Sequence, residues 1–140
     1  MKYLFTVLMV FLLACKSNSD IGLGSVNITG KWRLVSFDIP SPDDSGSIEV
    51  KIADSEPYEQ MIITDQYQFE FRTMSGTMTK KDNFGTVAFD KKNKTVVFVS
   101  GRYVGNSLSY VISKLTPTEL ELKQQTRVGP LGRRYQKILD

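Results

Sequence analysis

The sequence predicts an all-β protein, an up-and-down antiparallel β-barrel of about eight to ten strands. Short segments alternate apolar and polar residues with the period of two that is typical of strands. Turn-forming residues separate these segments at short and even intervals, and no helical pattern follows the N-terminal apolar segment. With 140 residues, of which 41% are hydrophobic and 24% charged, the chain has the size and composition of one globular domain.

The first strand is expected at residues 30–37, and the other strands are arranged to close against it. Trp32 is the only tryptophan, and we expect it to lie with Leu34 on the inner face, at the floor of the barrel. The residues that alternate onto the opposite face are Arg33, Val35 and Phe37. A polar loop at 39–46 follows and marks the open end.

The remaining strands follow from the same alternation. We expect them at residues 47–52, 60–64, 67–73, 84–89, 95–99, 108–115, 119–125 and 133–139. Segment 100–106 is either a loop or a short strand, and a turn at 129–132 precedes the last strand, which pairs with the first. Residues 96–99 are apolar on both faces, which predicts external cover.

One set of apolar side chains is a candidate ligand pocket. Its members are Leu34, Tyr67, Phe69, Phe71 and Phe89. The three aromatic residues of segment 67–73 alternate onto one face of that strand. The alternative is that these side chains form ordinary hydrophobic core. Burying an apolar side chain is equally favourable whether its neighbour is a ligand or another side chain, so the sequence does not separate the two.

The N-terminus has the pattern of an exported protein. Lys2 precedes an apolar run at residues 3–13, which is shorter than the ~20 residues needed to span a bilayer. Cys15 is the only cysteine, so the fold contains no internal disulfide. We divide the chain into a signal peptide at 1–14, a lipidated N-terminus with a flexible tether at 15–27, and a barrel at 28–140.

Residues 12–15, Leu-Leu-Ala-Cys, resemble the lipobox of bacterial lipoproteins. The resemblance implies cleavage before Cys15 and acylation of that cysteine, which would anchor the protein to a membrane. Lys16 stands where an inner-membrane retention signal has aspartate, so the resemblance implies an outer-membrane lipoprotein of the bacterial cell envelope, facing the periplasm or the exterior. An ordinary secretory signal is the alternative.

Three further segments resemble the lipocalin-like (calycin) domain of small bacterial lipoproteins: Gly-Lys-Trp-Arg-Leu-Val-Ser at 30–36, Leu-Thr-Pro-Thr-Glu-Leu-Glu-Leu-Lys at 115–123, and Tyr-Gln-Lys-Ile at 135–138. The resemblance implies a barrel that holds a small apolar molecule. It also implies that Gly30 and Trp32 form the barrel closure and that Arg133 or Arg134 lies across Trp32. The chain departs from typical lipocalins in its short length and in lacking a C-terminal helix and a disulfide.

Composition argues against several classes of function. The chain has no histidine, and so lacks the commonest general base and metal ligand. We therefore expect no enzyme, no cofactor and no metal site. The 18 basic and 15 acidic residues are interspersed, which argues against a nucleic-acid partner.

The leading hypothesis is a membrane-anchored lipocalin-like lipoprotein that binds a small apolar ligand in its barrel. The alternative is a filled barrel that docks on a cell-envelope protein of unknown identity. An apolar cavity favours the first, whereas a packed interior with an exposed apolar patch favours the second.

Overall fold

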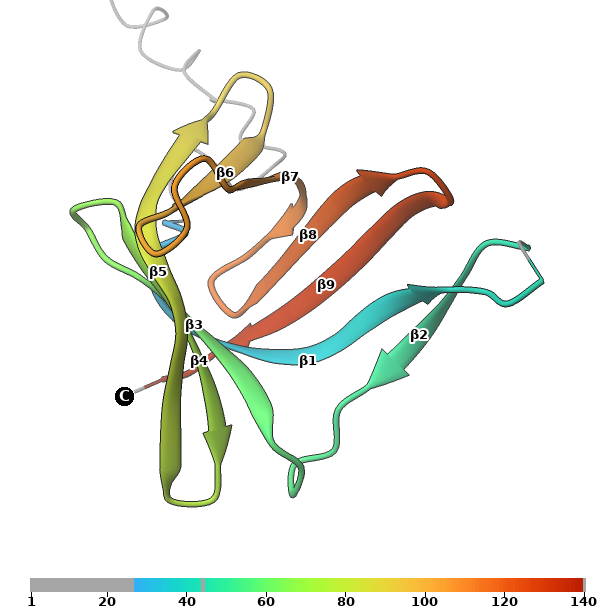
Figure 1. The fold of residues 1–140 in the computed structure, drawn as a ribbon, viewed down its shortest axis with the longest axis horizontal. Coiled ribbons are helices and arrows are strands. Elements are labelled where there is room, and N and C mark those ends of the chain that lie inside the picture. Colours follow the sequence, from blue (N-terminus) through green and yellow to red (C-terminus); the bar gives the residue numbers. More distant parts are fainter. Residues whose placement is uncertain (1–26, 44, 140) are drawn as a thin grey trace, which may run out of the picture.

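Every regular element of the described chain is a β-strand (Figure 1). The computed structural model describes residues 27–43 and 45–139. The predicted signal peptide, Cys15 and the tether up to residue 26 lie outside these residues. The strands are β1 Gly30–Pro40, β2 Ser47–Lys51, β3 Tyr58–Ile63, β4 Gln68–Ser75, β5 Met78–Asp90, β6 Thr95–Ser100, β7 Ser107–Leu115, β8 Glu119–Thr126 and β9 Gly129–Lys137. No helix in this part of the chain is long and apolar enough to span a membrane.

The strands form a closed antiparallel barrel. Neighbours pair in the order β2-β1-β3-β4-β5-β6-β7-β8-β9, and β1 also pairs with β9, which closes the sheet. The start of β1 pairs with β3 and its end pairs with β2, so β2 and β3 share one edge of β1. The barrel therefore has eight strands around its circumference, and the predicted all-β, up-and-down antiparallel barrel is confirmed.

Two strands extend into segments that were predicted to be loops. β1 continues through Pro40, because its end forms a hairpin with β2 in which Pro40 pairs with Ser47. β9 begins at Gly129, where Thr126 pairs with Gly129 across a turn at residues 127–128. The predicted turn at 129–132 is therefore wrong, and the last strand begins four residues earlier than residue 133. Segment 101–106 is a loop.

A β-bulge in β1 changes which face its side chains occupy. The register with β9 shifts between Leu34 and Ser36, so that Leu34 lies opposite Tyr135 while Phe37 lies opposite Arg133. An extra residue in one strand reverses the alternation beyond it. Phe37 consequently joins the inner face with Leu34 and packs against the core, contrary to the prediction that placed it outside.

The core fills the half of the barrel where β1 begins, which we call the closed end. The β3–β4, β5–β6 and β7–β8 turns lie at this end because the strands alternate in direction. Its buried apolar residues are Ile28, Trp32, Leu34, Met61, Ile63, Phe69, Val87, Val96, Phe98, Tyr110, Ile112, Leu115, Leu120, Leu122 and Tyr135. On the outer face Val99 and Val111 are exposed, so the external cover expected over 96–99 is absent from the described chain.

Candidate functional site

The closed end is packed with side chains. Trp32 is 0% exposed, and its indole Nε1 donates a hydrogen bond of 2.8 Å to the carbonyl of Ile28. Phe69 makes edge contacts with Phe71 and Phe98 at ring-centroid distances of 5.3 and 5.1 Å. Interlocking aromatic contacts of this kind favour a filled interior over a pocket at this depth.

The cation over Trp32 is a lysine rather than an arginine. Lys137 Nζ lies 5.2 Å from the centroid of the Trp32 ring, because the register of β1 with β9 places Trp32 opposite Lys137. Gly30 has a φ of +124°, and a Cβ there would lie 2.8 Å from Lys137 Cε. The predicted arginine position is therefore wrong, and Gly30 leaves the space through which the Lys137 side chain reaches the indole.

Charged side chains replace apolar ones on the inner face toward the other end of the barrel, which we call the open end. Arg133 Nη2 lies 2.8 Å from Glu59 Oε1, and Arg133 Nε donates to the Tyr135 hydroxyl at 3.0 Å. That hydroxyl donates to Glu59 Oε1 at 2.9 Å. The side chains of Arg133 and Glu59 are 31% and 29% exposed, so solvent reaches this pair from the open end.

Glu59, Arg133 and Tyr135 form a trio in which the pKa values of Arg133 and Tyr135 are both raised above their ordinary values. Burial raises the pKa of Tyr135 well above its ordinary value, with the Glu59 carboxylate adding to the effect, so the phenol remains a donor. Burial lowers the pKa of Arg133, but its interactions with Tyr135 and Glu59, including the hydrogen bond to the Tyr135 hydroxyl, outweigh burial and raise that pKa overall. Within the described chain the hydrogen bonds of Arg133 use Nε and Nη2, and no buried side-chain nitrogen there lacks a partner, so Arg133 Nη1 is a charged donor that solvent reaches.

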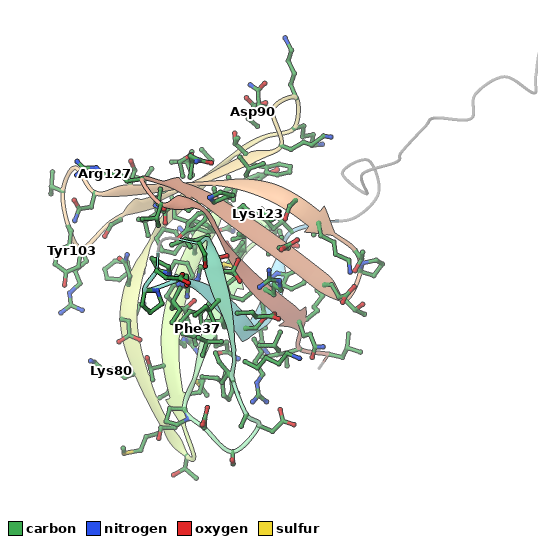
Figure 2. All side chains as sticks on the ribbon, turned by 90° about the vertical axis from the view of Figure 1, so that its right-hand side faces the viewer. Phe37, Lys80, Asp90, Tyr103, Lys123 and Arg127 are labelled. Atoms are coloured by element: carbon green, nitrogen blue, oxygen red, sulfur yellow. The ribbon has the colours of Figure 1, made fainter. Side chains whose placement is uncertain are left out.

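Aromatic and polar groups from other strands also lie toward the open end. Phe37 and Phe71 are partly buried and pack on the core from the open side, and Figure 2 shows Phe37 near the centre of the barrel when the molecule is turned by 90°. Asn83 lies opposite Phe71 across β4 and β5, and its Oδ1 accepts a 2.8 Å hydrogen bond from Ser100 Oγ. The open end thus combines two aromatic surfaces with polar groups, a combination suited to a small amphipathic molecule.

The five residues predicted to bind a ligand do not share one pocket. Leu34 and Phe69 are core residues, whereas Phe71 lies between the core and the open end. Phe89 and Tyr67 line a surface hollow of about 730 Å³ at the closed end. Tyr67 is 53% exposed and has a φ of +54°, so it belongs to the β3–β4 turn rather than to the face of β4.

A second hollow, which the sequence did not reveal, lies on the outer wall of β3, β4 and β5. Its volume is about 440 Å³, and Glu70, Arg72, Lys81 and Phe84 are among its lining residues. Lys81 Nζ lies 3.0 Å from Glu70 and 4.6 Å from the Phe84 ring centroid, and Arg72 also pairs with Glu70. The charged side chains of this hollow pair with one another.

Arg134 points outward and joins four strands. It pairs with Asp38 at 2.8 Å, Glu49 at 3.2 Å and Glu121 at 3.3 Å. The hydrogen bond from Arg134 and, to a lesser extent, the N–H of Gly132 hold the pKa of Asp38 below its usual range. This cluster fixes the β1–β2 hairpin to β8 and β9, and its role in the fold is structural.

Comparison with known proteins identifies a related architecture. No protein-family model and no curated protein matches the sequence. Among solved structures, a lipocalin-like protein from Bacteroides uniformis ATCC 8492 aligns over 79% of this chain and 97% of that chain, with a TM-score of 0.57 and 14% identity. At this identity the likeness concerns the fold alone, and eight-stranded barrels either are filled by side chains or hold one small ligand. The chain has a lipocalin-like barrel fold.

Proposed function

We propose that this protein is a membrane-tethered binding protein that holds a small, largely apolar molecule at the open end of its barrel. The observation that carries the proposal is the solvent-accessible Arg133–Glu59 pair on the inner face, with Phe37 opposite Arg133 across β1 and β9 and Phe71 packed on the core. A charged pair inside a barrel is costly to desolvate. Two apolar side chains could fill the positions of Arg133 and Glu59 without this cost. The presence of a charged pair there is consistent with a ligand-binding role.

The chemistry of the ligand follows from these groups. Its apolar part would lie on Phe37 and Phe71, and its polar group would accept a hydrogen bond from Arg133 Nη1. Because Leu34 and Phe69 lie in the packed core, they would support the site from beneath rather than touch the ligand. The site is therefore shallow, and discrimination among molecules of similar shape would be weak.

Tethering rests on the N-terminal sequence. Leu12, Ala14 and Cys15 have the lipobox pattern, so Cys15 would carry the acyl chains, and residues 16–27 would link it to the barrel. Lys16 favours the outer membrane as the destination. Radiolabelled or clickable fatty acid should label the chain in cells and should not label the Cys15→Ser variant; label that persists on the variant would contradict the assignment.

The binding site is tested by titration of residues 16–140, which include the whole barrel, with environment-sensitive fatty-acid and sterol probes. We expect micromolar binding that Phe71→Ala and Arg133→Leu weaken by about tenfold each. Arg127→Leu is the matched control, because Arg127 is exposed in the β8–β9 turn. Absence of binding by any probe, or equal loss in the control, would contradict the proposal.

A protein partner is the second candidate, and one observation favours it. Ile39 and Ile48 pair across the β1–β2 hairpin and remain 39% and 47% exposed. If no probe binds, a photo-crosslinking residue at position 48 in the acylated protein should capture a cell-envelope protein. The same residue at position 104, in the exposed β6–β7 loop, is the control.

A further inference from the structure

The closed end of the barrel differs from the open end in the arrangement of its exposed charges. The β5–β6 turn carries Lys91, Lys92 and Lys94 within four residues. Figure 2 shows Asp90 at the tip of this hairpin, which projects beyond the barrel. The loops of the open end instead mix acidic residues such as Asp54 with basic ones such as Arg102.

The acidic residue of this turn, Asp90, is exposed, but its carboxylate is occupied by hydrogen bonds within the turn. The Asp90 carboxylate accepts hydrogen bonds from the N–H groups of Lys92 and Asn93 at 2.9 and 3.2 Å. It accepts another from the Asn93 side chain at 2.7 Å. This network fixes the turn, and Lys91 and Lys92 are left exposed at its surface.

An aromatic residue lies beside the lysines. Tyr67, Phe89, Lys91 and Lys92 line the hollow of about 730 Å³ at this end. The backbone of Tyr67 is held by a 2.8 Å hydrogen bond that its carbonyl accepts from the N–H of Val87. Asp65 in the same turn and Asp90, which also lines the hollow, are the nearby acidic residues that are exposed to solvent. Exposed tyrosine next to lysine is the combination found where proteins contact the interface of a membrane.

The point at which the described chain enters the barrel determines which end a lipid anchor on Cys15 would hold near the membrane. The chain enters the barrel at the closed end, where Ile28 is buried under Trp32. As a flexible coil, residues 16–27 would span on the order of 20 Å. A lipid on Cys15 would therefore keep the closed end nearer to the membrane than the open end.

We infer that the closed end is a membrane-contacting surface, in which Lys91, Lys92 and Lys94 bind anionic phospholipid headgroups and Tyr67 lies at the interface. The inference rests on the proposed tethering through Cys15. It sets the orientation of the barrel, with the open end and its binding site directed away from the lipid. Each lysine near an anionic surface changes the ratio of docked to undocked protein by about fivefold.

Two tyrosines of equal exposure at opposite ends provide the test. Tyr67 is 53% exposed and Tyr103, in the β6–β7 loop, is 51% exposed. The acylated chain, which would begin at Cys15, is reconstituted into vesicles of phosphatidylcholine and phosphatidylglycerol that carry brominated acyl chains, which quench nearby indoles. We expect quenching in Tyr67→Trp and not in Tyr103→Trp. Trp32 should contribute an unquenched background, because it is fully buried.

The lysines are tested in the Tyr67→Trp background. Lys91→Gln combined with Lys92→Gln should reduce quenching, as should high salt or vesicles of phosphatidylcholine alone. Lys51→Gln combined with Lys80→Gln is the control, because both lysines are exposed away from the closed end. Equal quenching of the two tryptophan variants, or quenching unaffected by the lysines, would overturn the inference. Failure of the chain to float with vesicles would instead overturn the proposed tethering on which it rests.

Discussion

The closed and open halves of the barrel are built from the same strands but are stabilised in different ways. Along β3 the inner face changes from Ile63 and Met61 to Glu59, and along β9 it changes from Tyr135 to Arg133. The alternation of faces continues without change, but the side chains pass from apolar to charged. The closed half therefore supplies most of the stability of the barrel. In the open half, polar side chains occupy inner-face positions where apolar ones would stabilise the fold more, and a binding function would account for them.

The largest effect is expected from removing the central side chain of the closed half. Trp32→Ala should lower the free energy of unfolding by about 3–5 kcal/mol, a large part of the roughly 5–15 kcal/mol typical of a domain. Phe37→Ala, in the open half, should cost less than about 2 kcal/mol because Phe37 is only partly buried. Urea unfolding measures both, and equal losses would contradict the distinction between the halves.

The next effect concerns backbone packing beside the core. A Cβ on Gly85 would lie 1.9 Å from the carbonyl oxygen of Val99 and 2.8 Å from the N of Gly101. Gly85→Ala should therefore cost about 3 kcal/mol. Gly76→Ala is the control: its Cβ would meet nothing within 4 Å, and only its φ of +58° opposes the change, at about 1 kcal/mol. A Gly85→Ala variant as stable as the parent would show that β5 and β6 are less closely packed.

The charged pair of the open half should contribute little to stability. Glu59→Ala should cost about 1 kcal/mol, because solvent reaches both partners. Glu59→Gln keeps an oxygen acceptor for Arg133 and should cost less. A loss above about 3 kcal/mol in thermal or urea unfolding would indicate that the pair is a buried structural element, and would weaken the case for a binding role.

The smallest effect is expected in acid. Because the pKa of Asp38 is lower in the folded state, its ion pair with Arg134 contributes stability above the ordinary pKa of an aspartate. That contribution is lost as the pH falls below about 4. Asp38→Asn should therefore flatten the dependence of stability on pH in this range. The free energy of unfolding is measured as a function of pH. The same loss of stability below about pH 4 in Asp38→Asn and in the parent would show that the Asp38–Arg134 ion pair does not contribute to it.

The fold was largely predictable because most strands follow simple alternation. The alternation of apolar and polar residues could not reveal the bulge at Val35, which places Phe37 on the inner face. The bulge is apparent only from the pairing of β1 with β9. The start of β9 was mistaken for a similar reason: Gly129 and Gly132 suggested a turn, whereas the chain turns at residues 127–128. The arginine expected over Trp32 was implied by the resemblance to lipocalins, whereas the pairing of β1 with β9 places Lys137 there.

The candidate site was less predictable. Glu59 and Arg133 are 74 residues apart in the chain, and neither stands out in a local pattern. Their pairing depends on β1 separating β3 from β9 in the closed barrel. The aromatic residues were recognised, but the sequence did not reveal that Tyr67 leaves the strand at a φ of +54°.

The central claim is that a ligand binds at the open end, above a filled closed half. Its most direct test is a map of amide chemical shifts in residues 16–140 during titration with a saturated fatty acid. We expect the largest changes near Phe37, Glu59, Phe71 and Arg133, with little change at Met61 and Ile112 in the core. Changes centred on Met61 and Ile112, or none anywhere, would contradict the claim.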